Sequence, residues 1–239
     1  PNYLIYINKH KMAVSVDTVY QRVLAILNKE QRGYVTPQEF NLFANQAQSD
    51  IFEQYFYDIN QFGRVHGNDT EYSDMLNLLN EKINIFEKTG NMTYSAPNWT
   101  VPSDLYRLGT IIYNNIEAER INANEYLYIN ASPLTKPTND RPIFVASSTG
   151  YKVYGAAALT SGVSCNYIKV PATVEWAYNT VAGRAVYNAS NATNFELHAS
   201  EETELVFKIL QLAGLSIKEL QVYQIGNQME GQNTQQEKA

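Results

Sequence analysis

Residues 36–60 read TPQEFNLFANQAQSDIFEQYFYDIN, and this stretch sets the architecture of the first third of the chain. Thr36 and Glu39 have the spacing of a capping box, and Pro37 stands at the first helical position, where its missing N–H is not needed. We therefore expect a helix over residues 37–60. Apolar residues at helical spacing predict its buried stripe: Phe40, Phe43, Ala44, Ala47, Ile51, Tyr55 and Ile59.

The same helix carries aromatic residues outside that stripe, namely Phe52, Phe56 and Tyr57. A helix that is apolar on more than one side packs against more than one neighbour. We predict that another helix or another subunit covers these three residues, and they are our candidate interface.

Two further helices are expected beside this one. A single stripe runs from Val16 to Leu27 through positions spaced three and four apart. A third helix is predicted over residues 72–88, with Gly90 as a left-handed stop just past its end. Three amphipathic helices with short connections form a small bundle, so we assign residues 12–91 to a helical domain.

The character of the chain changes after Gly90, where prolines separate short segments rich in Tyr, Val, Ile and Thr. This pattern is typical of antiparallel sheet, and we assign residues 92–197 to a β-rich domain. Within residues 143–154 we expect a hairpin that turns at Gly150. The predicted strands cover residues 104–113, 126–129, 142–147, 151–154 and 165–170.

A last helix is predicted after Ser200, because a capping residue followed by Glu201 and Glu202 favours a helix start. We assign residues 198–225 to a C-terminal segment whose helix packs back on the rest of the chain, and we expect this helix to end at Gly214. Residues 226–239 are polar and are predicted to form a flexible tail. The fold class is thus α+β: an N-terminal helical bundle, an antiparallel β domain and a C-terminal helix. Residues 1–11 precede Met12 and are expected to be an extension that is not native.

Composition excludes several function classes. The net charge is -6 and Lys and Arg are not clustered, which disfavours specific nucleic-acid binding. The chain contains no run of about 18 apolar residues, so we predict no membrane span. The 18 tyrosines suit partly wet interfaces, although half-buried tyrosines on sheets explain them equally well.

Residues that could carry chemistry are few. Phosphate-binding glycine loops and zinc-binding histidine motifs are absent from the sequence. We interpret His198 as a helix cap and Cys165, the single cysteine, as a buried strand residue rather than as partners in catalysis. We therefore predict no catalytic residue, no metal and no cofactor. Trp99 and Trp176 are either core residues or a platform for stacking sugars.

Glu117, Glu119 and Glu125 lie close together in the sequence and suggest either an acid pair or a cation site. Arg120 stands among them, which favours a solvated, charged edge instead.

Four stretches are more distinctive than the general pattern of helices and strands. They are residues 16–60, above all NKEQRGYVTPQEFN at 28–41, then NASPLTKPT at 130–138, CNYIKVP at 165–171 and FELHASEETELV at 195–206. Together they resemble a family of structural proteins of tailed bacteriophages, from marine and crAss-like phages, that look like ring or adaptor proteins of the portal-to-tail connector.

The resemblance implies a virion protein, assembled in the bacterial cytoplasm, whose copies form a ring, typically a dodecamer. The ring would contact portal and tail proteins and let DNA pass through its lumen, and the family brings no catalytic residues. Two rival hypotheses remain open: a tail or receptor-contacting virion protein that binds glycans through its tyrosine-rich sheet, and a hydrolase that uses scattered side chains.

Overall fold

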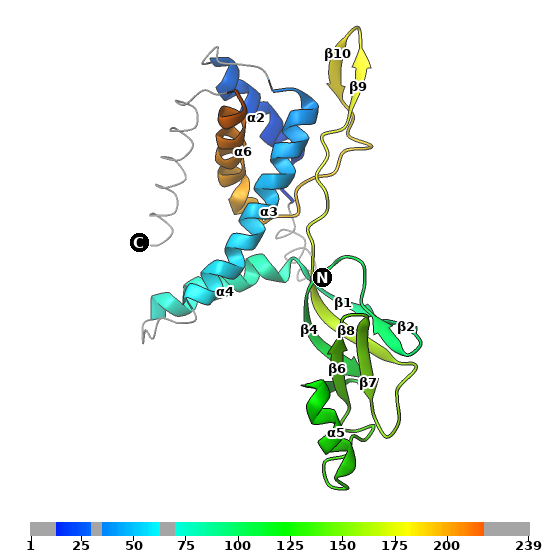
Figure 1. The fold of residues 1–239 in the computed structure, drawn as a ribbon. Coiled ribbons are helices and arrows are strands. Elements are labelled where there is room, and N and C mark those ends of the chain that lie inside the picture. Colours follow the sequence, from blue (N-terminus) through cyan, green and yellow to red (C-terminus); the bar gives the residue numbers. More distant parts are fainter. Residues whose placement is uncertain (1–12, 30–34, 63–69, 218–239) are drawn as a thin grey trace, which may run out of the picture. The chain divides into compact units, whose positions relative to one another are not determined.

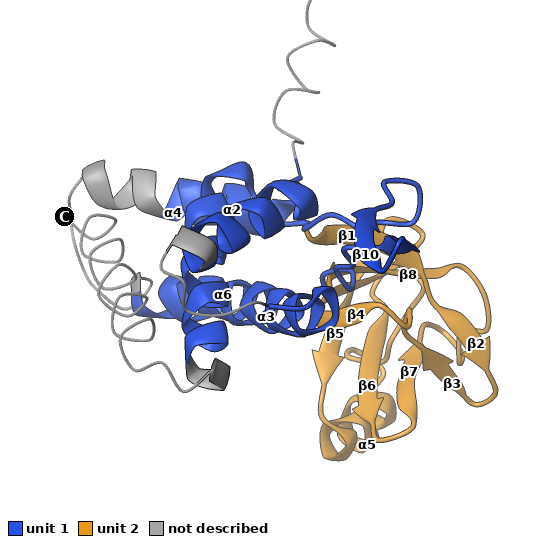
Figure 2. Ribbon diagram, turned by 90° about the horizontal axis from the view of Figure 1, so that it is seen from above, with its two compact units in different colours: residues 1–85, 171–239 blue, residues 86–170 orange. Residues whose placement is uncertain are grey.

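A computed structural model describes residues 13–29, 35–62 and 70–217 (Figure 1). The predictions for residues 1–11 and 226–239 lie outside these ranges. The chain divides into two compact units (Figure 2). The helical unit comprises Pro1–Ile85 and Pro171–Ala239, and the sheet unit comprises Phe86–Val170.

The helical unit confirms the predicted start of the long helix. The backbone N–H of Thr36 donates to Glu39 Oε2 at 2.9 Å, and the backbone N–H of Glu39 donates to Thr36 Oγ1 at 3.3 Å, so the capping box is formed. The helices of this unit are α2 (Val16–Lys29), α3 (Pro37–Phe62), α4 (Thr70–Asn84), the 3-10 turn η2 (Ala199–Glu201) and α6 (Glu202–Ile217).

Apolar stripes of these helices form the core of the helical unit, where α6 packs against α2 and α3. The predicted stripe of α3 lies inward, with Phe43 and Ile59 only partly buried. Gly214 does not end the last helix as expected, because α6 continues to Ile217. The largest side chains fully buried in this core include Phe40, Ile51, Phe195, Leu197, Leu205 and Ile209.

The sheet unit contains one sheet in the order β1-β8-β4-β5-β6-β7-β3-β2. Its strands are β1 (Glu87–Asn91), β2 (Thr93–Ser95), β3 (Asn98–Thr100), β4 (Leu105–Tyr113), β5 (Ile116–Ile121), β6 (Ile143–Ser147), β7 (Gly150–Tyr154) and β8 (Val163–Lys169). The hairpin turning at Gly150 is confirmed, since β6 and β7 pair antiparallel and Gly150 has φ +135.

The prediction of a purely antiparallel sheet is wrong in one place. Strands β5 and β6 are parallel, with Glu119 opposite Ile143 and Ile121 opposite Val145. A parallel pair needs a crossover connection, and helix α5 (Ala123–Ala131) provides part of it. The chain is therefore mixed α+β, and its sheet is mixed rather than antiparallel.

Two local predictions are corrected for identifiable reasons. Residues 126–129 form part of α5 rather than a strand, because Asn122 and Glu125 close a capping box at the helix start. The third helix ends at Asn84 and not at residue 88. Residues beyond it pair with β8 as strand β1, and Gly90 lies in this strand, where an added Cβ would come within 3.0 Å of the Tyr167 ring.

The observed boundaries of the units also differ from the predicted domains. Residues 171–197, assigned to the β-rich domain by the sequence, belong to the helical unit. They include a two-stranded sheet formed by β9 (Tyr178–Val181) and β10 (Arg184–Tyr187).

Among the described residues, none of the helices is both long enough and apolar enough to cross a membrane.

Candidate functional site

The polar side of α3 holds an extended stretch of backbone. Asn45 binds both backbone groups of Val174: its Nδ2 donates to the Val174 carbonyl at 2.8 Å, and its Oδ1 accepts from the Val174 N–H at 2.8 Å. Asn41 binds Trp176 in the same way: its Nδ2 donates to the Trp176 carbonyl at 3.4 Å, and its Oδ1 accepts from the Trp176 N–H at 2.8 Å. Four helical residues rise about 6 Å and two extended residues about 6.6 Å, so amides four apart meet alternate residues of the extended chain.

The pattern continues one step further along α3. Gln48 Nε2 donates to the Ala172 carbonyl at 2.9 Å, and the Ala172 N–H donates to Glu196 Oε2 at 2.8 Å. The Glu196 N–H in turn donates to Gln48 Oε1 at 3.1 Å. We call Asn41, Asn45 and Gln48 the amide ladder. It gives partners to a non-sheet backbone that would otherwise be buried without them.

Trp176 ends this extended stretch and anchors the hairpin that follows. Its ring is buried and lies 4.3 Å from the Tyr20 ring, 5.9 Å from that of Tyr178 and 5.6 Å from that of Tyr187, measured between centroids. Its Nε1–H donates to Asp17 Oδ1 at 2.9 Å. Since Trp99 is buried as well, the core role predicted as one alternative for both tryptophans is confirmed, and neither offers a face for stacking sugars.

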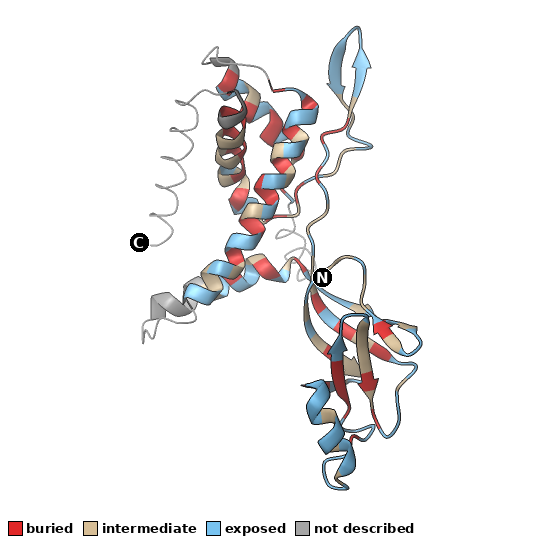
Figure 3. Cartoon of the chain, in the orientation of Figure 1, coloured by how far each residue is buried: buried red, intermediate tan, exposed pale blue. Residues whose placement is uncertain are grey.

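The β9–β10 hairpin has two different faces. Its register pairs Val186 with Asn179 and Arg184 with Val181, and alternation along each strand places these four residues together. We call them the outer hairpin face. Tyr178 and Tyr187 lie on the other face, against Trp176. Val181 is 59% and Val186 50% exposed, and the hairpin is exposed along most of its length (Figure 3).

Helix α5 of the sheet unit has no buried residue. Its inner side carries Tyr126 and Ile129, and the Tyr126 ring stacks on that of Tyr154 at 4.4 Å. Leu127 and Tyr128 are 69% and 79% exposed, and Leu134 in the following turn is 90% exposed. We call these last three residues the α5 surface.

The candidate interface on α3 is divided by the structure. Phe52 is only 2% exposed, so this chain already covers it. Phe56 is partly buried and packs edge-on against Phe52 at 5.1 Å. Tyr57 is 56% exposed and accepts a hydrogen bond from Gln61 Nε2 at 2.6 Å. Of the three residues, Tyr57 is the one available at the surface for a contact with another molecule.

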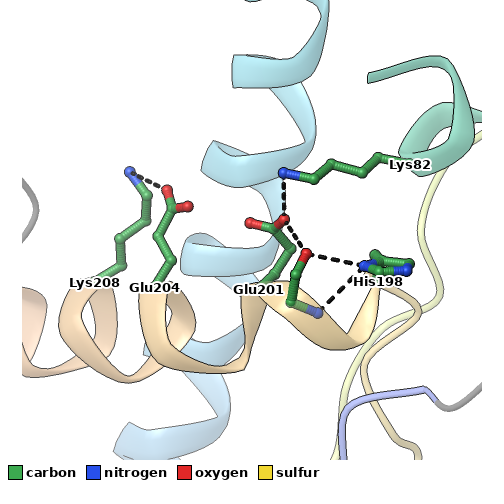
Figure 4. Close-up of polar contacts among 6 residues, drawn as sticks. Lys82, His198, Glu201, Glu204 and Lys208 are labelled. Atoms are coloured by element: carbon green, nitrogen blue, oxygen red, sulfur yellow. Dashed lines mark hydrogen bonds and ion pairs between the residues drawn. The ribbon is translucent and has the colours of Figure 1, made fainter. Parts of the chain in front are cut away.

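A polar cluster fixes the start of α6 (Figure 4). The Lys82 ammonium lies 2.7 Å from Glu201 Oε1, and Glu201 is buried. The Ser200 hydroxyl donates to the same carboxylate at 2.9 Å. His198 Nδ1 accepts from the Ser200 N–H at 3.3 Å, which confirms the prediction that His198 is a cap. Because His198 Nδ1 already accepts a backbone N–H, His198 caps this helix start. The ion pair between Lys82 and Glu201 joins the same helix start to α4.

The glutamates singled out in the sequence are on the surface of the sheet unit. Glu117 and Glu119 are exposed on β5, as is Arg120, while Glu125 caps α5. Strand β5 is an inner strand of the sheet rather than an edge. Within the part of the chain that the structure describes, no group of three or more His, Cys, Asp or Glu side chains is placed to hold a metal ion.

Cys165 lies in β8 and is fully buried in the core of the sheet unit, as its place in a strand predicted. Burial, with a smaller contribution from the charge of Asp104, raises the pKa of its thiol. A thiol needs its ionised form to act as a nucleophile, so this environment suits packing and not catalysis.

This burial predicts a slow reaction of Cys165 with a maleimide at pH 8. We expect native protein to be modified at least about tenfold more slowly than urea-unfolded protein, because few thiolates form and access requires opening of the sheet. Mass spectrometry over time measures both rates. Equal rates would contradict the buried position.

Sequence reasoning missed the amide ladder, the outer hairpin face and the α5 surface. Signals for two of them are present: amides at positions 41, 45 and 48 share one side of a helix, and Ala182-Gly183 separates two apolar segments by a two-residue turn.

In the comparisons with known proteins, no family and no curated protein matches the chain.

Proposed function

We propose that this protein is a structural subunit of a tailed-phage virion. Its copies would form a ring at the head-to-tail connector and bridge portal and tail proteins. The observation that carries this proposal is the presence of exposed apolar groups on separate, folded surfaces: Tyr57 on α3, the outer hairpin face and the α5 surface. Contiguous exposed apolar surface commonly marks an interaction site.

A closed ring requires a heterologous interface, in which one surface meets a different surface on the next copy. A chain with several unlike exposed apolar surfaces fits this requirement. The helices α2, α3 and α6 and the mixed sheet would be contributed by every copy. The net charge of -6 suits a lumen through which DNA slides, because like charges repel within about a Debye length.

The experiment is a native mass measurement of the purified protein across a concentration series. We expect a species near twelve times the subunit mass of 27.1 kDa. Replacing Tyr57 with aspartate should shift the distribution toward smaller species, while the exposed change Glu53→Gln on the same helix should not. A wild-type protein that stays monomeric at high concentration would contradict the proposed function.

A further inference from the structure

We propose that the chain bends at one joint, formed by residues 84–85 and 170–171, so that the sheet unit changes its direction relative to the helical unit while both units stay folded. At this joint the chain enters the sheet unit after Ile85 and leaves it before Pro171. The inference goes beyond the proposed function, since it concerns a single copy of the chain and holds whether or not copies assemble.

On the side of the sheet unit, the two chain crossings are fixed to each other. The Lys169 N–H donates to the Phe86 carbonyl at 2.9 Å, and the Val170 N–H donates to the Asp104 carbonyl at 2.8 Å. The Asp104 carboxylate also lies 2.8 Å from the ammonium of Lys88 in β1. Asp104 thus ties the strand that enters the unit to the residue at which the chain leaves it. Both crossings therefore move with the sheet unit as one body.

On the side of the helical unit, each crossing starts from an anchored residue. Lys82 in the last turn of α4 lies 2.7 Å from the carboxylate of buried Glu201 (Figure 4). After the other crossing, the Ala172 carbonyl accepts from Gln48 at 2.9 Å and its N–H donates to Glu196 at 2.8 Å. The short segments between the anchors of the two sides absorb a change of direction.

The joint has the properties of a hinge. Residue 85 lies in the turn after α4, and residues 170–171 are neither helix nor strand. The four residues of the joint are exposed or partly buried, whereas Ile83 and Phe86 on either side of the first crossing are buried. Pro171 has no N–H, so a bend there leaves no donor unpaired. In hinge motion a few residues at the ends of elements take up the change in backbone angles.

Each unit has a core of its own, which a bend at the joint leaves intact. The buried cluster around Trp99, Ile111 and Cys165 draws all its members from the sheet unit. In the helical unit, α6 packs against α2 and α3. Units with separate cores and few chain crossings are expected to move relative to each other. In the proposed ring, this bend would let one unit follow its neighbour while the other unit stays fixed.

Distances between pairs of nitroxide spin labels test the joint. Labels on Glu53→Cys and Ser148→Cys report across the two units. Gln21→Cys paired with Glu53→Cys reports within the helical unit, and Glu117→Cys paired with Ser148→Cys reports within the sheet unit. All four positions are exposed, while the native Cys165 is buried. Labelled protein is diluted into excess unlabelled protein, so that the distances within one chain are measured.

We expect the distance distribution across the units to be at least about twofold broader than either distribution within a unit. Equal widths for all three pairs would overturn the inference, because they would show one rigid body. The outcome is separate from that of the native mass measurement. A monomer of the wild-type protein contradicts the proposed function and leaves the joint standing, whereas equal widths contradict the joint alone.

Folded variants locate the bend. Pro171→Gly frees the backbone of the second crossing and should broaden the distribution across the units about 1.5-fold. Pro133→Gly makes the same change at an exposed proline of the sheet unit and should not broaden it. Lys82→Met removes the anchor of α4 and should broaden it, whereas Lys208→Met breaks a pair within α6 and should not. An unchanged width in Pro171→Gly would overturn the position given to the joint, whatever the outcome for Lys82→Met.

Discussion

Replacing Trp176 with alanine is expected to lower the free energy of unfolding of the helical unit by about 3–5 kcal/mol. The substitution empties a buried site bordered by Tyr20, Tyr178 and Tyr187. It also leaves Asp17 Oδ1 without the indole N–H that donates to it at 2.9 Å. Urea unfolding followed by far-ultraviolet circular dichroism measures the change.

Trp176→Phe separates the two causes. Phenylalanine keeps most of the stacking area but removes the N–H donor, so we expect an intermediate loss of about 1–2 kcal/mol. Tyr128→Ala is the control for removal of an aromatic side chain from the surface, and it should change stability by less than about 0.5 kcal/mol. Equal unfolding midpoints for Trp176→Ala and wild type would show that the ring does not anchor the fold.

Replacing Asn45 with alanine should cost about 2–4 kcal/mol. The buried Val174 would lose partners for both its backbone N–H and its carbonyl, and each group left unpaired costs about 1–3 kcal/mol. Amide hydrogen exchange gives a local readout, because the Val174 N–H should exchange faster while the amides within the sheet unit keep their rates.

Gln46→Ala is the matched control for the amide ladder. Gln46 is the next residue of α3, is exposed, and donates to the partly buried Asp50 carboxylate at 2.7 Å. Its removal should change stability by less than about 0.5 kcal/mol. Unchanged exchange at Val174 in the Asn45→Ala protein would contradict the role given to the ladder.

Features fixed by neighbours in the sequence could be predicted. The capping box of Thr36 and Glu39 locates the start of α3 because both partners lie within one helical turn. The turn at Gly150 is similarly local. In α5 the apolar run at 126–129 predicts a strand, although the capping signal of Asn122 and Glu125 is present in the sequence. There a local cap and the crossover between parallel strands override β propensity.

Features fixed by distant partners could not be predicted. Residues after Asn84 look helical in the sequence, but they become strand β1 because β8 lies beside them in the fold. The amides of Asn41, Asn45 and Gln48 are visible as a row, whereas the backbone they bind lies more than a hundred residues away. Of the candidate interface, the pattern identified three aromatic residues, but only the packing separates buried Phe52 from exposed Tyr57.

The sheet unit is inserted between two parts of the helical unit, and its ends are joined by a hydrogen bond of 2.9 Å from the Lys169 N–H to the Phe86 carbonyl. On the ribosome, α2 and α3 emerge well before α6, which completes their shared core. At about 5–20 residues per second, the intervening segment takes on the order of ten seconds to synthesise. During that interval the nascent helices expose the apolar stripe that α6 later covers, so chaperone binding to the growing chain should be strongest then.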